Sequence, residues 1–90
     1  MDFEENLELL NRRGLHARAS AKFVRACEDR DVTVEVTKGS STVNGKSIMG
    51  LLMLGAAKGD QITVKVTGAE AEDVFLSLKE MVADKFGEGE

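Results

Sequence analysis

Two stretches in which apolar and polar residues strictly alternate constrain the fold of this chain more than any other feature. The apolar positions are Val32, Val34 and Val36 in the first stretch and Ile62, Val64 and Val66 in the second. Successive side chains of a β-strand point to opposite faces, so each stretch predicts a strand with one apolar face and one polar face. Strands of this kind are typical of an antiparallel sheet that packs on a core with one face and meets water with the other.

The rest of the chain predicts two further strands and three helices. We expect strands over residues 3–10, 32–37, 40–43 and 62–67, and helices over residues 17–28, 48–54 and 69–86. Gly-containing pairs mark the turns between them, and residues 87–90 are expected to fray. The two long helices are amphipathic and can cover the apolar face of the sheet. The prediction is an α+β fold in one domain over residues 1–90, with an open four-stranded antiparallel sheet and its helices on one face.

The charge balance argues against a nucleic-acid-binding protein. The chain has a formal net charge of −4 and an isoelectric point near 5.0, whereas a nucleic-acid binder needs a basic face to neutralise phosphates. Basic residues nevertheless gather near the only histidine, at Arg12, Arg13, Arg18, Lys22 and Arg25. A local positive patch on an acidic chain favours an acidic protein partner or a single phosphate. Binding to DNA or RNA is the weaker alternative.

The chain has too few cysteines and histidines for a disulfide or an ordinary zinc site. Cys27 is the only cysteine and His16 the only histidine, and a zinc site usually takes four such ligands. Cys27 falls on the apolar face of the first expected helix, so we predict a buried hydrophobic role for it. The chain begins with an acidic segment and contains no apolar run long enough to cross a bilayer. We therefore expect a cytoplasmic protein that needs no metal, cofactor or membrane.

His16 lies where the first strand gives way to the first helix. The N-terminus of a helix carries unpaired N–H groups and a partial positive charge, which favour an anion and disfavour an imidazolium. We therefore expect a neutral ring with a lone pair that can act as a nucleophile. A phosphoryl group on this ring would face the amides of Ala17 and Arg18 and the Arg18 guanidinium, and Gly14 permits the tight turn before it. On these residues alone, a surface histidine without a chemical role is the more ordinary interpretation.

The short helix expected over residues 48–54 is too apolar to be buried completely. Six of its seven residues are apolar, and a helix of this length offers only one face to the core. Exposed contiguous apolar side chains are typical of a partner surface, and methionine adapts well to different partners. Ser47 precedes the helix and is a favourable N-cap residue. A wholly buried helix is the alternative interpretation.

Two motifs in this order of elements resemble the HPr family, the histidine-containing phosphocarriers of the bacterial phosphotransferase system. The first is Gly14-Leu15-His16-Ala17-Arg18, ahead of the first helix, and the second is Lys46-Ser47-Ile48-Met49-Gly50-Leu51, at the start of the short helix. The resemblance extends over nearly the whole chain. It implies the open-faced βαββαβα sandwich of that family.

The resemblance also implies a function and the residues that carry it. His16 would accept a phosphoryl group on Nδ1 from phosphorylated enzyme I and pass it to a histidine of an enzyme IIA, with Arg18 assisting. The protein would thus be a phosphocarrier with a transient phosphohistidine rather than an enzyme. Ser47 matches the serine that HPr kinase/phosphorylase modifies in many members. The apolar docking patch of the family corresponds to Ile48, Met49 and Leu52.

Three points stay open in this resemblance. Many members have proline where this chain has Ala19, and we expect transfer to survive this difference. The active-site sequence also resembles HPr forms that regulate nitrogen or carbon metabolism rather than import sugar. A regulatory role and a role in sugar import therefore both stay open. A binding module without phosphoryl chemistry is the remaining alternative. A small carrier that must present one face to several partners is expected to be a monomer.

Overall fold

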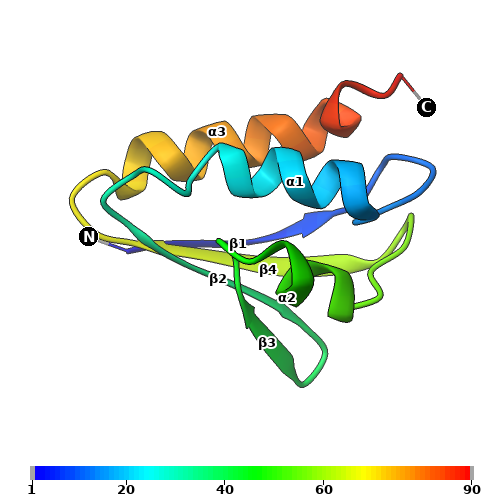
Figure 1. Ribbon diagram of the computed structural model, residues 1–90, viewed down its shortest axis with the longest axis horizontal. Coiled ribbons are helices and arrows are strands. Elements are labelled where there is room, and N and C mark those ends of the chain that lie inside the picture. The colour runs from blue at the N-terminus through cyan, green and yellow to red at the C-terminus, as the bar shows by residue number, and fades with distance from the viewer. Residues whose placement is uncertain (1, 90) are drawn as a thin grey trace.

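Four strands form one antiparallel sheet in the computed structural model, which describes residues 2–89. The strands are β1 (Asp2–Glu8), β2 (Thr33–Lys38), β3 (Ser41–Asn44) and β4 (Gln61–Thr67). Their order in the sheet is β1-β4-β2-β3, so β4 pairs with both β1 and β2 while β3 forms an edge (Figure 1). The predicted antiparallel sheet with a short polar edge strand is confirmed.

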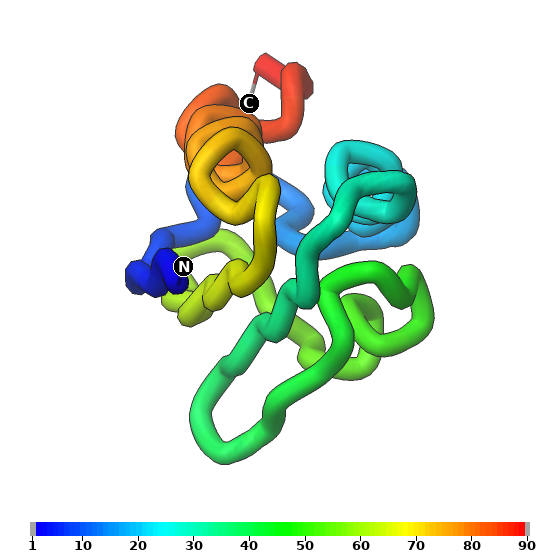
Figure 2. The backbone as a smooth tube through the Cα atoms, turned by 90° about the vertical axis from the view of Figure 1, so that its left-hand side faces the viewer, coloured from blue at the N-terminus to red at the C-terminus, as the bar shows by residue number. Residues whose placement is uncertain are grey.

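The helices lie together on one side of this sheet. They are α1 (Ala17–Arg25), α2 (Ile48–Met53) and α3 (Ala71–Ala83), followed by a 3₁₀ turn, η1 (Lys85–Gly87). Figure 2 shows α1, α2 and α3 on the same side, with the opposite face of the sheet left open. The predicted fold class is therefore confirmed.

The core lies between the sheet and the helices and contains the alternating residues that predicted the strands. All six apolar residues of the two alternating stretches are buried. Val34 and Val36 lie in β2, Val32 lies just before it, and Ile62, Val64 and Val66 lie in β4. Phe23 of α1 and Leu78 of α3 are fully buried opposite them. Cys27 is also buried, as predicted, and this burial raises the pKa of its thiol to about 11. The thiol therefore stays protonated and packs as a hydrophobic side chain.

The first helix differs from its prediction in length and in its buried face. It ends at Arg25 instead of residue 28, because the chain tightens there: the Cys27 N–H donates to the Val24 carbonyl, three residues back, at 3.0 Å. Ala19 and Ser20 are buried, whereas Ala21 of the predicted apolar face is only half-buried. Small residues near the start of α1 thus allow this end of the helix to approach the core closely.

The C-terminal prediction was wrong in two respects. The last helix ends at Ala83 instead of residue 86, because Lys85 and Phe86 both have φ of 55°, a left-handed conformation that cannot continue an α-helix. Residues 87–90 were expected to fray, but Phe86 is buried and the side chain of Glu88 is held inside the structure. Glu90 lies outside the described residues. After α3 the chain leaves the helix axis and lies at the side of the molecule where α1 begins (Figure 1), and Glu88 contacts His16 there.

Candidate functional site

The loop before α1 is fixed in place by a close approach of two backbone segments. Gly14 has φ of 62°, and a Cβ at this position would lie 2.3 Å from the carbonyl oxygen of Ala56. The next residue, Leu15, is buried and donates its N–H to the same Ala56 carbonyl at 3.0 Å. Only glycine fits here, because any side chain would collide with the segment that follows α2. This contact sets the position of His16.

His16 occupies the N-cap position of α1. Its backbone is extended, with φ of −78° and ψ of −178°, and its carbonyl accepts the N–H of Ser20 at 2.9 Å. The imidazole makes no capping hydrogen bond to the helix. The amides of Ala17 and Arg18 therefore have no acceptor within the helix and no cap from this side chain. The N-terminal position predicted for His16 is confirmed.

Glu88 contacts the histidine ring from the far end of the chain. Its Oε2 lies 2.5 Å from Nε2 of His16, and only 4% of its side chain is exposed. Its other carboxylate oxygen accepts a hydrogen bond from Nδ2 of Asn11 at 3.1 Å, and the same Nδ2 donates to the Gly14 carbonyl at 2.8 Å. Asn11 is fully buried. The loop before α1 and the C-terminal segment thus hold one carboxylate against the ring.

The charges around Glu88 keep it ionised. Its burial opposes ionisation, but the hydrogen bonds from His16 and Asn11 and the electrostatic attraction of His16 and Arg18 outweigh that effect and lower the pKa of the carboxyl. A carboxylate facing Nε2 accepts a hydrogen bond, so it favours the ring form whose proton lies on Nε2. Among the described residues, Nδ1 has no hydrogen-bond partner. The lone pair of the neutral ring therefore belongs to Nδ1.

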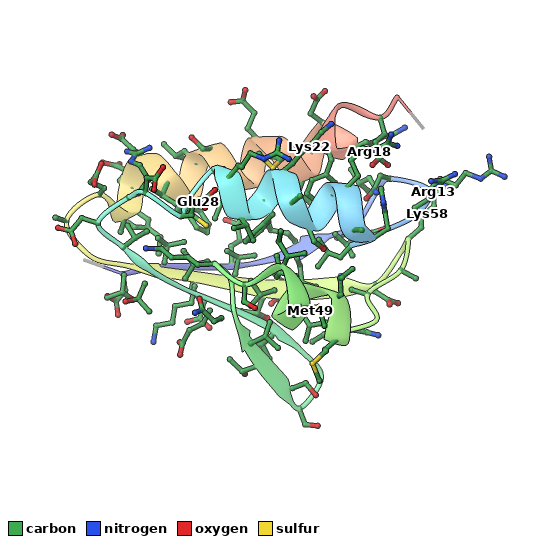
Figure 3. All side chains as sticks on the ribbon, viewed as in Figure 1. Arg13, Arg18, Lys22, Glu28, Met49 and Lys58 are labelled. Atoms are coloured by element: carbon green, nitrogen blue, oxygen red, sulfur yellow. The ribbon has the colours of Figure 1, made fainter. Side chains whose placement is uncertain are left out.

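Arg18 lies beside the ring but stays largely free. Its side chain is 64% exposed, and its Nε is 3.9 Å from the Glu88 carboxylate, which is a weak ionic contact. The guanidinium can therefore still grip an incoming anion with its planar set of donors. Figure 3 shows Arg18 and Lys22 projecting from α1 near the C-terminal segment, with Arg13 and Lys58 at the neighbouring loops. Of the basic residues expected near His16, Arg13, Arg18 and Lys22 thus lie on this side of the molecule (Figure 3).

The second motif forms the start of α2 as predicted. Ser47 is the N-cap, and its Oγ accepts a hydrogen bond from the Gly50 N–H at 3.0 Å. Of the three residues of the expected docking patch, Ile48 and Met49 are exposed and Leu52 is half-buried, while Leu51 points into the core. Met49 is 67% exposed and is visible on the outer side of α2 (Figure 3). The alternative of a wholly buried helix is wrong.

Sequence reasoning missed three residues of this region. Met53, which is 80% exposed, lies four residues after Met49 on α2, where helical periodicity could have indicated it. Glu88 and Asn11 carried no local signal. Within residues 2–89, no group of three or more His, Cys, Asp or Glu side chains could hold a metal ion, and no helix is long and apolar enough to cross a membrane.

Comparisons with known proteins agree with this geometry. The family profile described as the PTS HPr component phosphorylation site matches residues 3–84. The phosphocarrier protein HPr of Neisseria meningitidis serogroup A is 46% identical over 87 residues, covering 97% of this chain and 98% of the relative.

Two solved structures from Thermoanaerobacter tengcongensis are also similar. One, described as HPr-C-His, has a TM-score of 0.91 at 35% identity and covers 96% of this chain and 97% of that one. The other, described as an HPr dimer, has a TM-score of 0.76 at 35% identity and covers 91% and 94% of the two chains. With a family match over residues 3–84, relatives that are similar over nearly the whole chain and the same fold, the chain belongs to the HPr family, the phosphocarriers of the phosphotransferase system.

Proposed function

We propose that His16 accepts a phosphoryl group on Nδ1 from phosphorylated enzyme I and passes it to a histidine of an enzyme IIA. The protein would act as a stoichiometric carrier that is regenerated at each transfer. It would not be an enzyme with its own substrate pocket.

The single observation that supports this proposal best is the state of the two ring nitrogens. Nε2 is engaged by the Glu88 carboxylate at 2.5 Å, which leaves the lone pair on Nδ1 at the N-terminus of α1. A phosphoryl group on Nδ1 would lie near the amides of Ala17 and Arg18 and within reach of the exposed Arg18 guanidinium. These donors can share the charge of the equatorial oxygens during an in-line transfer between two histidines. Few donors at an open site also leave the phosphoryl group accessible to the next acceptor.

We place the docking surface for both partners on α2, beside this site. Its residues are Ile48, Met49 and Leu52, with Met53 added by its exposure. The segment after α2 contacts the loop before His16 through the Ala56 carbonyl, so a partner seated on this helix would also cover the histidine. The basic residues around His16 would attract acidic groups of the same partner. We further propose a cytoplasmic monomer, whose face is free for each partner in turn.

Ser47 is proposed as a regulatory phosphorylation site for an HPr kinase/phosphorylase. Its hydroxyl caps α2 and is half-buried. A phosphate at this position would bring close to two negative charges next to the docking surface. Binding of an acidic partner would weaken as a result, while the helix N-terminus would still tolerate the added anion.

The proposal is tested by the mass of the intact protein after incubation with enzyme I and phosphoenolpyruvate. We expect one acid-labile phosphoryl group on the wild-type protein and none on His16→Ala. Adding a purified enzyme IIA should then remove the group from the wild-type protein. No gain of mass, with an enzyme I that phosphorylates another HPr, would contradict the proposal and favour a binding module.

A further inference from the structure

We infer that Glu88 is a positioning residue of the phosphoryl-transfer site, which holds His16 through Nε2 and stabilises the charge that the ring acquires when Nδ1 is phosphorylated. This inference rests on the proposed function of His16. It adds to the site a residue that lies 72 positions away in the chain and beyond the residues matched by the family profile.

A turn at Lys85 and Phe86 positions the Glu88 carboxylate next to His16. Lys85 and Phe86 both adopt the left-handed conformation, which is unfavourable for residues other than glycine. Such a turn persists only where surrounding contacts impose it. Here Phe86 is buried in the core, and its carbonyl accepts a hydrogen bond from Lys22 of α1 at 2.7 Å. These two contacts hold the turn in place and so fix the start of the segment that carries Glu88.

The carboxylate itself is fixed on both oxygens. Asn11 donates to Oε1 and is fully buried, while Oε2 faces His16. Asn11 is in turn fixed by its bond to the Gly14 carbonyl, so the turn that places His16 also places the partner of its ring. A side chain with 4% exposure that is bound from two sides has little freedom to rotate away.

The contact between Glu88 and Nε2 of His16 affects the charge of the ring during phosphoryl transfer. In the transfer, the Nδ1 lone pair forms a bond to phosphorus while the bond between phosphorus and the donor nitrogen breaks, and the donor histidine leaves with that electron pair. The Nε2 proton stays in place, so the phosphorylated ring carries a positive charge. A carboxylate at Nε2 stabilises this charge, as an aspartate does for the histidine of a serine-protease triad. In the next step the same proton keeps the ring a good leaving group.

Arg18 remains available for the phosphoryl group in this arrangement. Its Nε is 3.9 Å from Oε2 of Glu88, and most of its side chain is exposed. Glu88 therefore binds the Nε2 side of the ring and leaves the guanidinium free to turn toward an anion on the Nδ1 side.

The test compares Glu88→Ala and Glu88→Gln with the wild-type protein in single-turnover phosphorylation by phosphorylated enzyme I. Glu80→Ala is the matched control, because Glu80 is an exposed carboxylate on α3. We expect Glu88→Ala to lower the rate at saturating phosphorylated enzyme I by about tenfold or more, the loss typical when the partner that orients a metal-bound histidine is removed. The concentration of enzyme I at half-saturation should hardly change, because the docking surface is intact.

The glutamine variant and the ring itself provide a second readout. Glu88→Gln keeps a neutral acceptor for Nε2–H without the charge, so its rate should lie between those of the wild type and Glu88→Ala. The nitrogen NMR spectrum of His16 should show the proton on Nε2 in the neutral wild-type ring and a larger share on Nδ1 in Glu88→Ala. If Glu88→Ala does not fold, the phosphorylation rate of Glu88→Gln tests the role of Glu88: a rate below that of the wild type supports it, and an equal rate contradicts it.

The outcomes separate this inference from the proposed function. A wild-type protein that accepts no phosphoryl group would overturn both. Phosphorylation of the wild-type protein with an equal or higher rate in both Glu88 variants would overturn only the role of Glu88.

Discussion

The ammonium group of Lys22 lies 2.7 Å from the backbone carbonyl oxygen of Phe86 and so joins α1 to the segment that follows α3. The same two segments bring together His16, the N-cap of α1, and Glu88, two residues after Phe86. This single contact therefore bears on both the stability of the C-terminal turn and the geometry at His16.

Replacing Lys22 with methionine should loosen this turn. The substitution keeps the apolar stem but removes the hydrogen bond, which is partly buried, so we expect a loss of about 1 kcal/mol in the free energy of unfolding. The amide protons of Gly87 and Glu88 should exchange faster with solvent. Arg25→Met, at an exposed position on the same helix, is the control. Unchanged exchange at both amides would show that Lys22 does not hold the segment.

The N-cap role of Ser47 predicts different effects for two substitutions. Ser47→Ala removes the acceptor of the Gly50 N–H and should destabilise the protein by about 1 kcal/mol, whereas Ser47→Asp can cap the helix and should stay near the wild type. Urea unfolding measures both. Ser40→Ala, at an exposed turn position, should have little effect. An aspartate variant as unstable as the alanine variant would refute the capping explanation.

The docking surface predicts a loss of partner binding without a loss of stability. Met49→Ala removes an exposed apolar side chain, so the free energy of unfolding should change by less than about 0.5 kcal/mol. Binding to enzyme I should weaken by about 1 kcal/mol or more, measured by calorimetry. Leu76→Ala is the matched control, because Leu76 is also an exposed apolar residue but lies on α3. If Met49→Ala, Leu76→Ala and the wild type bind enzyme I equally well, the docking surface does not include Met49.

The loop before β2 predicts a contribution to stability that depends on pH. Glu70 accepts hydrogen bonds from the Asp31 N–H and from the Arg30 guanidinium, each at 2.7 Å, and these contacts hold the pKa of its carboxyl below the ordinary value. A depressed pKa in the folded state stabilises the protein at pH values above the unfolded pKa, and this stabilisation is lost as the pH falls through the folded pKa.

Glu70→Gln should therefore flatten the fall in stability on acidification. Urea unfolding between about pH 7 and about pH 3 measures the difference, which should be largest at neutral pH and shrink in acid. Glu72→Gln, an exposed position in the first turn of α3, serves as the control. A difference between Glu70→Gln and the wild type that stays constant over this range would contradict the assignment.

The predictable parts of the fold are those encoded in local periodicity. The alternation around Val34 and Ile62 identified two strands and their buried face, because one side of the sheet packs on the core and the other meets water. The helix ends were less predictable. Nothing in the identities of Lys85 and Phe86 signals a left-handed turn, which arises from the burial of Phe86 and its contact with Lys22.

The residues of the candidate site also differ in how far the sequence could predict them. His16 and Ser47 could be identified because each stands at the start of a helix within a short motif. Glu88 could not, because its contact with His16 joins residues 72 positions apart and depends on how α3 ends. A contact of this kind is a property of the tertiary fold and leaves no trace in local sequence.

The most direct test of the account is to locate the phosphoryl group on the ring of His16. Protein labelled with a nitrogen isotope in histidine and phosphorylated by enzyme I should show coupling between phosphorus and Nδ1, with the proton retained on Nε2. Coupling to Nε2 would contradict the account, because that nitrogen is the one that Glu88 binds.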